Sequence, residues 1–199
     1  MHESEQGRMR RAGFLRHAAL VAGSAAGAGL VLNHRPAEQA EAQAATDQEA
    51  LNLALLVEYA EADFYAEAVR RKKLDGELRA FAEQVSAQED DHVAFIRSAL
   101  GSKARKKPSF DFGDSTGDPD AFADRAAEFE DLAVAAYAGQ AGNLSKATLT
   151  AAATLISVEA RHAAWIRSIV GRPPADQPTD TPRNADQVKG DLKRLGLKG

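Results

Sequence analysis

The chain has 199 residues, a net charge of −4 and no cysteine, and 44% of its residues are hydrophobic. This length suits one domain with a sizeable core. The charge gives no sign of the concentrated basic face that nucleic-acid binders carry, and the basic run 103–107 is typical of a solvated loop. The absence of cysteine excludes disulfides, cysteine-ligated zinc and iron–sulfur clusters. We therefore expect a folded domain that has no nucleic-acid partner.

The first 44 residues have the layout of an export signal, with a charged start, an apolar middle and a small-residue cleavage site. Arg8, Arg10 and Arg11 precede an apolar stretch over 18–32. Ala42-Gln43-Ala44 fits the cleavage site. Residues 10–16 resemble a twin-arginine signal, with one extra residue before the phenylalanine. The stretch is too short for a membrane span, which needs about 20 apolar residues. We expect a periplasmic or extracellular mature chain, with a retained anchor as the alternative.

Two amphipathic helices are predicted in the first half of the remaining chain. Thr46-x-x-Glu49 is a capping box, and it predicts a first helix from there to about residue 72. The second is predicted over 76–100, capped by Asp75 and ended by Gly101, because glycine tolerates the left-handed backbone common after a helix. Together these two helices would form a hairpin.

The second half predicts another hairpin after a long connection. Residues 102–117 indicate an irregular segment, and Asp118-Pro119 is a cap followed by proline at the first helical position. That helix is expected to run to about residue 138, and a fourth helix to span 145–170. A connection of this length is typical of a crossover between the ends of a bundle. The sequence therefore predicts an all-α four-helix bundle of ferritin-like topology over 45–171.

The last 28 residues, 172–199, contain four prolines and many polar side chains. This composition predicts an extended or loosely attached tail. One or two helical turns are expected within 186–197.

The second half of the bundle repeats the first. Each half has a glutamate and a tyrosine seven residues apart on one helix, and Glu-x-x-His on the next helix, where residues three apart share a face. We expect an approximate two-fold axis down the bundle, with six candidate metal ligands around it. The ligands are Glu58, Glu89, His92, Glu130, Glu159 and His162, and Tyr65 and Tyr137 are either core aromatics or hydrogen-bond partners of the ligands.

Burying four carboxylates on one seam is costly unless cations compensate their charge. Two divalent ions would supply four positive charges. Sets of carboxylate and imidazole ligands on four helices suit iron or manganese better than zinc. The pattern therefore predicts a dinuclear site.

Some neighbouring residues compete with these ligands or could adjust them. Glu61 lies one turn from Glu58 on nearly the same face, and Glu128 lies close to Glu130, although only Glu130 keeps the repeat. Three charged residues beside the ligands in sequence are expected to orient them. These are Asp90, Asp91 and Arg161.

Residues 47–171 resemble the ferritin-like superfamily, particularly exported bacterial members related to desiccation-associated proteins. The resemblance rests on the six candidate ligands and on the stretch 158–165. It implies that Glu89 and Glu159 bridge two metals, that Glu58 and Glu130 are terminal ligands, and that each histidine holds one metal. It also implies two iron ions, or alternatively manganese. It implies no haem, because the haem-binding methionine of bacterioferritins has no counterpart in a mature chain that would lack methionine.

The function implied by this resemblance is the oxidation of iron by dioxygen or peroxide, which would detoxify iron or the oxidant. One alternative is a protective exported protein whose metals only stabilise the bundle. A manganese catalase-like activity is another. Assembly into a homo-oligomer stays open.

Overall fold

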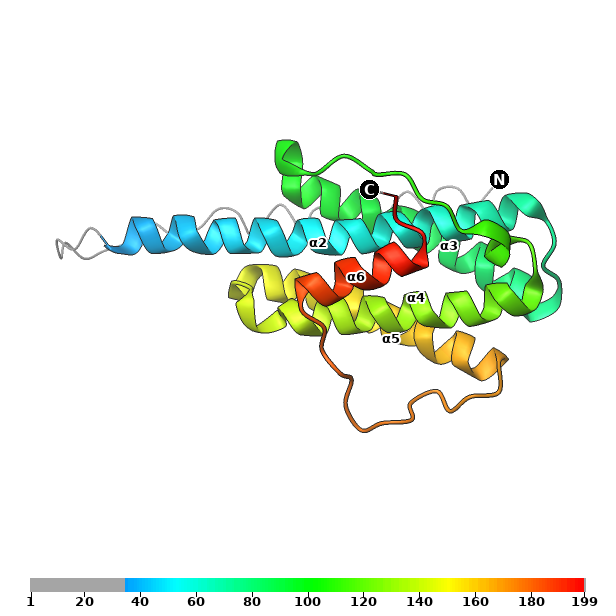
Figure 1. Ribbon diagram of the computed structural model, residues 1–199. Coiled ribbons are helices and arrows are strands. Elements are labelled where there is room, and N and C mark those ends of the chain that lie inside the picture. The colour runs from blue at the N-terminus through cyan, green and yellow to red at the C-terminus, as the bar shows by residue number, and fades with distance from the viewer. Residues whose placement is uncertain (1–34, 199) are drawn as a thin grey trace, which may run out of the picture.

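The structure, a computed structural model, describes residues 35–198 and is all-α over that range (Figure 1). Its five α-helices form four long rods and one short C-terminal element. They are α2 (Arg35–Arg71), α3 (Gly76–Leu100), α4 (Pro119–Gln140), α5 (Lys146–Ile169) and α6 (Ala185–Leu195). Within these bounds, the predicted four-helix architecture is confirmed.

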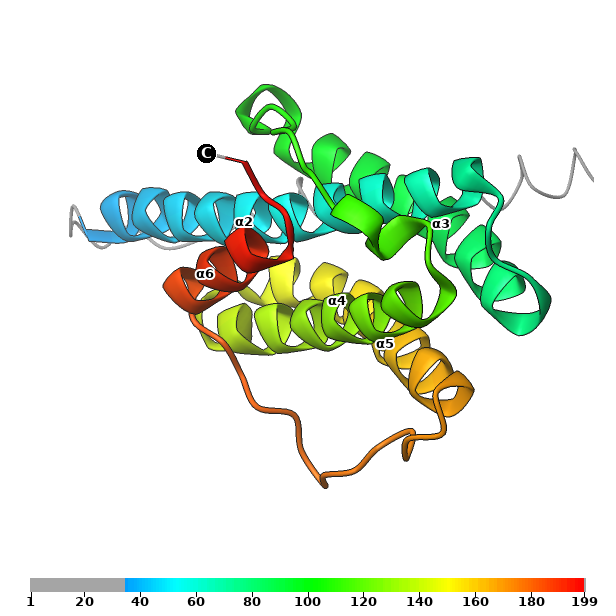
Figure 2. The same cartoon turned by 45° about the vertical axis from the view of Figure 1, so that its right-hand side comes forward.

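The four long helices form two antiparallel hairpins, α2 with α3 and α4 with α5. Helix α2 lies beside α4, and α3 lies beside α5 (Figure 2). The crossover after α3 travels along the bundle before α4 begins, so α3 and α4 run in the same direction. Consequently each helix of the second hairpin runs antiparallel to its counterpart in the first.

Several helix ends follow the predicted local chemistry. Asp118 accepts a hydrogen bond from the Ala121 N–H (2.9 Å), and Ser145 caps α5 by accepting one from the Thr148 N–H (3.3 Å). Each bond satisfies an amide that has no partner within the helix. Gly101 has a φ of 54°, which only glycine adopts readily, and it ends α3 as predicted.

One predicted helix start is wrong, and one predicted cap makes no side-chain hydrogen bond. Helix α2 begins at Arg35 and passes through Thr46, whose hydroxyl donates to the Ala42 carbonyl (3.0 Å) instead of capping. The alanine-rich stretch 37–45 favours helix strongly enough to carry α2 beyond the capping box. Asp75 precedes α3, but its side chain makes no capping hydrogen bond.

The predicted export signal falls largely outside the described residues. Its arginine motif and apolar stretch lie before residue 35, whereas Ala42-Gln43-Ala44 lies within α2. Among residues 35–198, no helix is long and apolar enough to cross a membrane.

The crossover and the tail are more ordered than expected. The crossover contains two short 3-10 helices, Gly101–Lys103 and Gly113–Thr116, and Phe110 forms an isolated antiparallel bridge with Leu197. Helix α6 has three turns and packs against α2 and α4 (Figure 1). The tail is therefore docked on the bundle, because the apolar face of α6 is buried there. That face consists of Val188, Leu192 and Leu195.

We expect Leu192→Ala to lower the free energy of unfolding by about 2–5 kcal/mol, the usual effect of emptying a fully buried leucine site. Leu192 is 1% exposed. The exposed neighbour Lys193 provides the control, because Lys193→Ala should change stability by less than about 0.5 kcal/mol. Urea denaturation measures both variants. A Leu192→Ala variant as stable as the control would show that α6 does not contribute to the core.

Candidate metal centre

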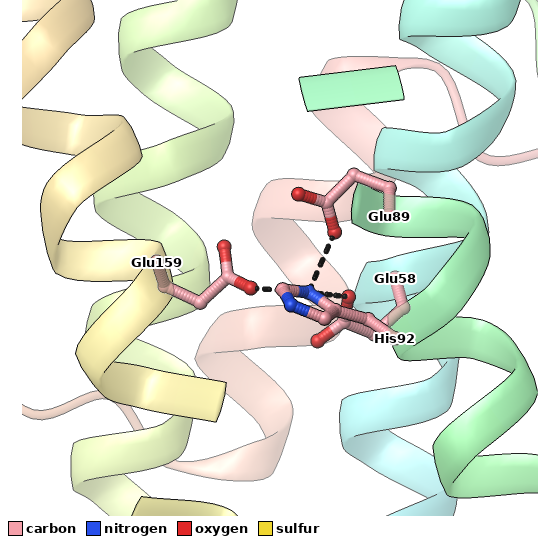
Figure 3. A group of neighbouring side chains, drawn as sticks. All are labelled: Glu58, Glu89, His92 and Glu159. Atoms are coloured by element: carbon pink, nitrogen blue, oxygen red, sulfur yellow. Dashed lines mark hydrogen bonds and ion pairs between the residues drawn. The ribbon is translucent and has the colours of Figure 1, made fainter. Parts of the chain in front are cut away.

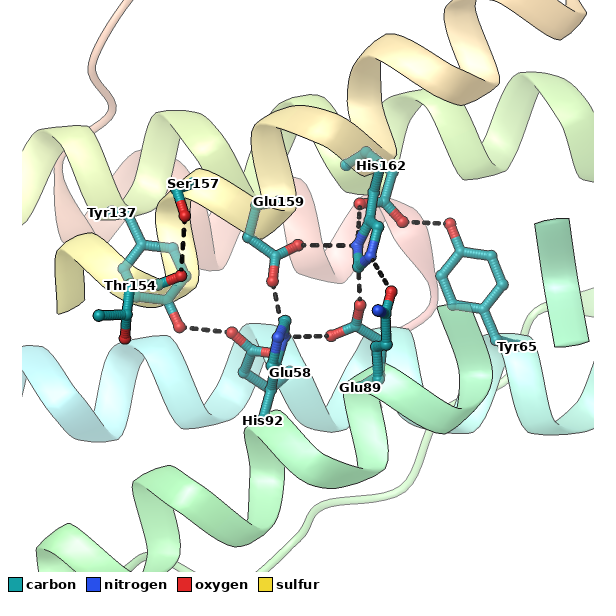
Figure 4. Close-up of polar contacts among 11 residues, drawn as sticks. Glu58, Tyr65, Glu89, His92, Tyr137, Thr154, Ser157, Glu159 and His162 are labelled. Atoms are coloured by element: carbon teal, nitrogen blue, oxygen red, sulfur yellow. Dashed lines mark hydrogen bonds and ion pairs between the residues drawn. The ribbon is translucent and has the colours of Figure 1, made fainter. Parts of the chain in front are cut away.

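The six predicted ligands converge inside the bundle. Glu58 comes from α2, Glu89 and His92 from α3, Glu130 from α4, and Glu159 and His162 from α5. The four carboxylates have no solvent exposure, and the histidines are at most 7% exposed. Figure 4 shows the side chains of Glu58, Glu89, His92, Glu159 and His162 between Tyr137 at one end and Tyr65 at the other. The two tyrosines belong to two separate apolar clusters, so hydrophobic packing encloses the polar row at both ends.

The ligand atoms form two overlapping groups, and within each group they all lie within 4.8 Å of one another. The first contains Glu58, Glu89, His92 and Glu159 (Figure 3), and the second contains Glu89, Glu130, Glu159 and His162. Glu89 and Glu159 belong to both. The geometry thus provides two adjacent places for a cation, with two carboxylates between them.

Each histidine points a ring nitrogen at three carboxylates. His92 Nδ1 lies 2.7 Å from a Glu159 oxygen, 3.1 Å from Glu89 and 3.2 Å from Glu58. His162 Nδ1 lies 3.2 Å from a Glu89 oxygen, 3.4 Å from Glu130 and 3.6 Å from Glu159. In both cases the imidazole nitrogen lies close enough to the three carboxylates for all four side chains to bind one cation.

Each of the two tyrosines contacts a glutamate in the opposite half of the bundle. Tyr137 of α4 donates a hydrogen bond to Glu58 of α2 (2.5 Å), and Tyr65 of α2 donates one to Glu130 of α4. Both hydroxyls are buried and have a carboxylate partner, so they fix the orientation of the two outer glutamates. This is the hydrogen-bonding role considered from the sequence.

These tyrosine–glutamate contacts correct the expected direction of the two-fold axis. An axis down the bundle would place equivalent helices parallel to each other. Here Tyr65 lies level with Glu130, and Glu58 lies level with Tyr137, so α2 and α4 run antiparallel. The approximate axis therefore crosses the bundle between the two cation positions, and the end-to-end crossover is the physical reason.

Charge in the cluster is balanced by protons when cations are absent. Burial opposes charging of the histidines, but the surrounding carboxylates outweigh it, raising the pKa of His162 to about 12 and that of His92 further. Burial raises the pKa of Glu130 to about 7 and that of Glu89 well above its usual range. Burial also opposes ionisation of Glu159, yet contacts with both histidines hold its pKa below the ordinary value.

The cluster leaves many buried polar atoms without a hydrogen-bond partner. They include Glu89 Oε1, Glu130 Oε2, both oxygens of Glu159 and Nδ1 of His162. His92 Nδ1 forms hydrogen bonds with Glu58 and Glu89, whereas its contact with Glu159 and the contacts of His162 Nδ1 with three carboxylates are ion pairs whose angles do not make good hydrogen bonds. Orphaned acceptors at this density are unusual in a folded interior. A set of carboxylate oxygens and imidazole nitrogens left in this way fits a divalent cation at each position.

Other residues singled out from the sequence lie away from the cluster. Glu128 is on the surface, where it pairs with Arg125 and Arg194, so it does not compete with Glu130. Asp90, Asp91 and Arg161 are on exposed faces of their helices, so their expected effect on the ligands stays a prediction.

Sequence reasoning missed Gln88, whose side-chain oxygen lies 2.7 Å from His162 Nε2. This contact fixes the second ring nitrogen of His162, as hydrogen-bonded partners of metal-binding histidines commonly do. The repeat offers no signal for it, because Val158 stands at the equivalent position before Glu159.

The fold and the ligand set now bear on the identity of the chain. Comparison with known families matches a ferritin-like domain over residues 46–172, well over half of the chain. The chain belongs to the ferritin-like family. Comparison with curated proteins gave no match. A ferritin-like bundle with buried glutamates and histidines that could hold a metal fits a metal carboxylate protein.

We expect Tyr137→Phe to weaken cation binding at the Glu58 position by about 10–100-fold, the usual effect of removing a hydrogen bond to a ligand. Binding at the Glu130 position should change less than about twofold. Tyr59→Phe is the control, because Tyr59 is equally buried but contacts Arg97 and Arg105 outside the cluster. Titration with Mn²⁺ measures both sites. Equal effects of the two variants would contradict a role for the Tyr137 hydroxyl.

Proposed function

We propose that this ferritin-like protein binds two iron ions between α2–α5 and uses them to oxidise ferrous iron with dioxygen or peroxide outside the cytoplasm. One observation carries the proposal. Two four-residue groups of buried ligands share Glu89 and Glu159, so two ions would lie next to each other rather than in separate sites. Adjacent ions allow one oxidant to contact both.

In this proposal each residue has a defined part. Glu89 and Glu159 would hold both ions, Glu58 and Glu130 would each hold one, and each histidine would bind one ion. Such an arrangement would let an oxidant reach the ions. When bound, the iron supplies the electrons that reduce dioxygen or peroxide.

The remaining residues of the centre hold the ligands and limit water. Tyr65 and Tyr137 each orient an outer glutamate, and Gln88 orients His162. Apolar clusters pack at both ends of the row. Because these contacts hold the side chains of the centre in place, binding an ion would need little rearrangement of them.

The proposal is tested by adding ferrous iron to the metal-free protein under air and following ferric absorbance. Oxidation should be faster than in buffer and should be accompanied by two bound ions per chain. The manganese-loaded protein with hydrogen peroxide forms a second arm, in which oxygen release would instead favour catalase-like chemistry. No bound metal and no acceleration of oxidation would overturn the proposal.

Export is a separate part of the proposal. Residues 1–44 would act as the signal, and cleavage after Ala44 would remove the first ten residues of α2. Ala42 and Ala44 are exposed, which supports access by a peptidase. N-terminal sequencing of protein recovered from the periplasm of an expressing bacterium tests this proposal. A chain that stays in the cytoplasm with its N-terminus intact would contradict it.

A further inference from the structure

Glu61 is a buried carboxylate that the proposed centre does not use. It lies on α2, one turn after Glu58, and has no solvent exposure. Neither of its carboxylate oxygens has a hydrogen-bond partner. An isolated buried carboxylate is expensive unless it is protonated or meets a cation.

The position of Glu61 along α2 places it beside one half of the centre. Glu61 lies between Glu58, which contacts Tyr137, and Tyr65, which contacts Glu130, so it is on the side of Glu58 that faces the Glu130–His162 group. Burial raises the pKa of Glu61 most, and among nearby charges Glu130 contributes most, followed by Glu159 and Glu89. Glu58, on the same helix, contributes least of the four. Glu159 and Glu89 belong to both groups, and the larger effect of Glu130 than of Glu58 agrees with a position beside the group that contains His162.

The repeat makes Glu61 unusual. Glu58 corresponds to Glu130 and Tyr65 to Tyr137, both 72 positions later, and on the same count Glu61 corresponds to Ala133. Ala133 is also fully buried, so both positions face the interior of the bundle. Only one half of the duplicated centre therefore carries the additional carboxylate.

We propose that Glu61 is a seventh metal ligand, which binds the ion at the Glu130–His162 position and makes the two ions inequivalent. This inference rests on the proposed dinuclear centre. Without an ion, the Glu61 oxygens lie outside the two groups of closely spaced ligand atoms, so the side chain must rotate to bind. Rotation breaks no hydrogen bond, because the carboxylate has none.

The additional ligand changes both coordination and charge. The Glu130–His162 position would have five protein ligands, whereas the Glu58–His92 position has four. The negative charges of four carboxylates balance the positive charges of two divalent ions. A fifth carboxylate favours a higher total positive charge on the two ions. The ion beside Glu61 is therefore the more tightly held of the two.

Calorimetric titration of the metal-free protein with Mn²⁺ tests this assignment, using Glu61→Gln and the control Glu49→Gln. Glutamine keeps the shape of the side chain and removes its charge. Glu49 lies on the same helix but on the surface, where it pairs with Arg105. The wild type and the control should bind two ions of unequal affinity. In Glu61→Gln the tighter ion should weaken by at least about tenfold, with the other changing less than about threefold.

The outcomes separate this inference from the proposed function. A wild type that binds no Mn²⁺ overturns both, whereas a Glu61→Gln variant with two wild-type affinities overturns only the role of Glu61. Equal weakening of both ions also overturns it, because that result indicates a general charge effect. Crystals of the wild type soaked in Mn²⁺ give a check independent of any variant. A manganese ion bonded to Glu61 supports the assignment, and two ions without Glu61 as a ligand contradict it.

Discussion

Replacing Glu89 by glutamine is expected to remove both ions, although it changes one residue of one half. Glu89 belongs to both groups of ligand atoms, and an amide cannot supply the negative charge that bridges two cations. Affinity for each ion should fall by at least about a hundredfold, the upper end of what the loss of an outer-shell partner produces. Glu83→Gln is the matched control, because Glu83 lies on the same helix at the surface.

The same variant should also lose the stabilisation that metal gives. At 100 times the dissociation constant, one bound ion stabilises the fold by about 2.7 kcal/mol, which raises the melting temperature of a domain of this size by roughly 5–10 °C. Glu89→Gln should show no such rise, while Glu83→Gln should match the wild type. A Glu89→Gln variant that keeps one tightly bound ion would contradict the shared role of this residue.

This comparison also bears on the alternative that the metals are purely structural. Under that alternative, the wild type would show the rise in melting temperature but no acceleration of iron oxidation. Under the proposed function, Glu89→Gln loses both together. Measuring melting and oxidation on the same samples therefore distinguishes the two functions.

Cation affinity is expected to rise steeply with pH between pH 6 and 8, by at least about tenfold per unit for each ion and therefore about a hundredfold per unit for binding both. Both histidines have a raised pKa, about 12 for His162 and higher for His92, so both are protonated without metal throughout this window. A ligand must be neutral imidazole, so binding two ions releases at least two protons. Each released proton makes the affinity about tenfold larger per pH unit. Binding is therefore strongest at high pH and is lost as pH falls.

Titration with Mn²⁺ at pH 6, 7 and 8 measures this dependence, and calorimetry in buffers of different ionisation enthalpy counts the released protons. The raised pKa of Glu89 adds to the release in the same direction. The Tyr59→Phe variant should show the wild-type dependence, because its change lies outside the cluster. Affinity that does not vary over this window would show that the histidines are not ligands.

The bundle and its ligands were predictable because two independent periodicities agree. Apolar residues at steps of three and four define each helix, and Glu58, Glu89, Glu130 and Glu159 fall on the same stripes as the core. Each ligand also recurs in the second half. Buried glutamates at equivalent positions of the two halves indicate a partner that they share. The pattern therefore predicted the convergence that the structure shows.

Other features depended on balances that local patterns do not determine. The capping box at Thr46 is a real signal, but an alanine-rich stretch before it makes continuation of α2 more favourable than a cap. The end-to-end crossover was predicted, and it makes α2 and α4 run antiparallel. The direction of the two-fold axis, across the bundle, could therefore have been inferred from the sequence. Gln88 has no counterpart in the repeat, and only packing places it against His162.

Glu61 illustrates the same limit. From the sequence, Glu58 and Glu61 share nearly one helix face, and either could have been the ligand. The structure buries both, gives the Tyr137 contact to Glu58, and leaves Glu61 without a partner. Spacing along a helix identifies both residues as candidates, whereas contacts from neighbouring helices show how their surroundings differ.

Anomalous diffraction at the iron edge tests most directly whether this ferritin-like bundle holds two adjacent metal ions, as proposed. Crystals of the protein loaded anaerobically with ferrous iron should show two anomalous peaks between α2, α3, α4 and α5, one beside His92 and one beside His162, with Glu89 and Glu159 contacting both. A single peak, or none in this cluster, would contradict the account.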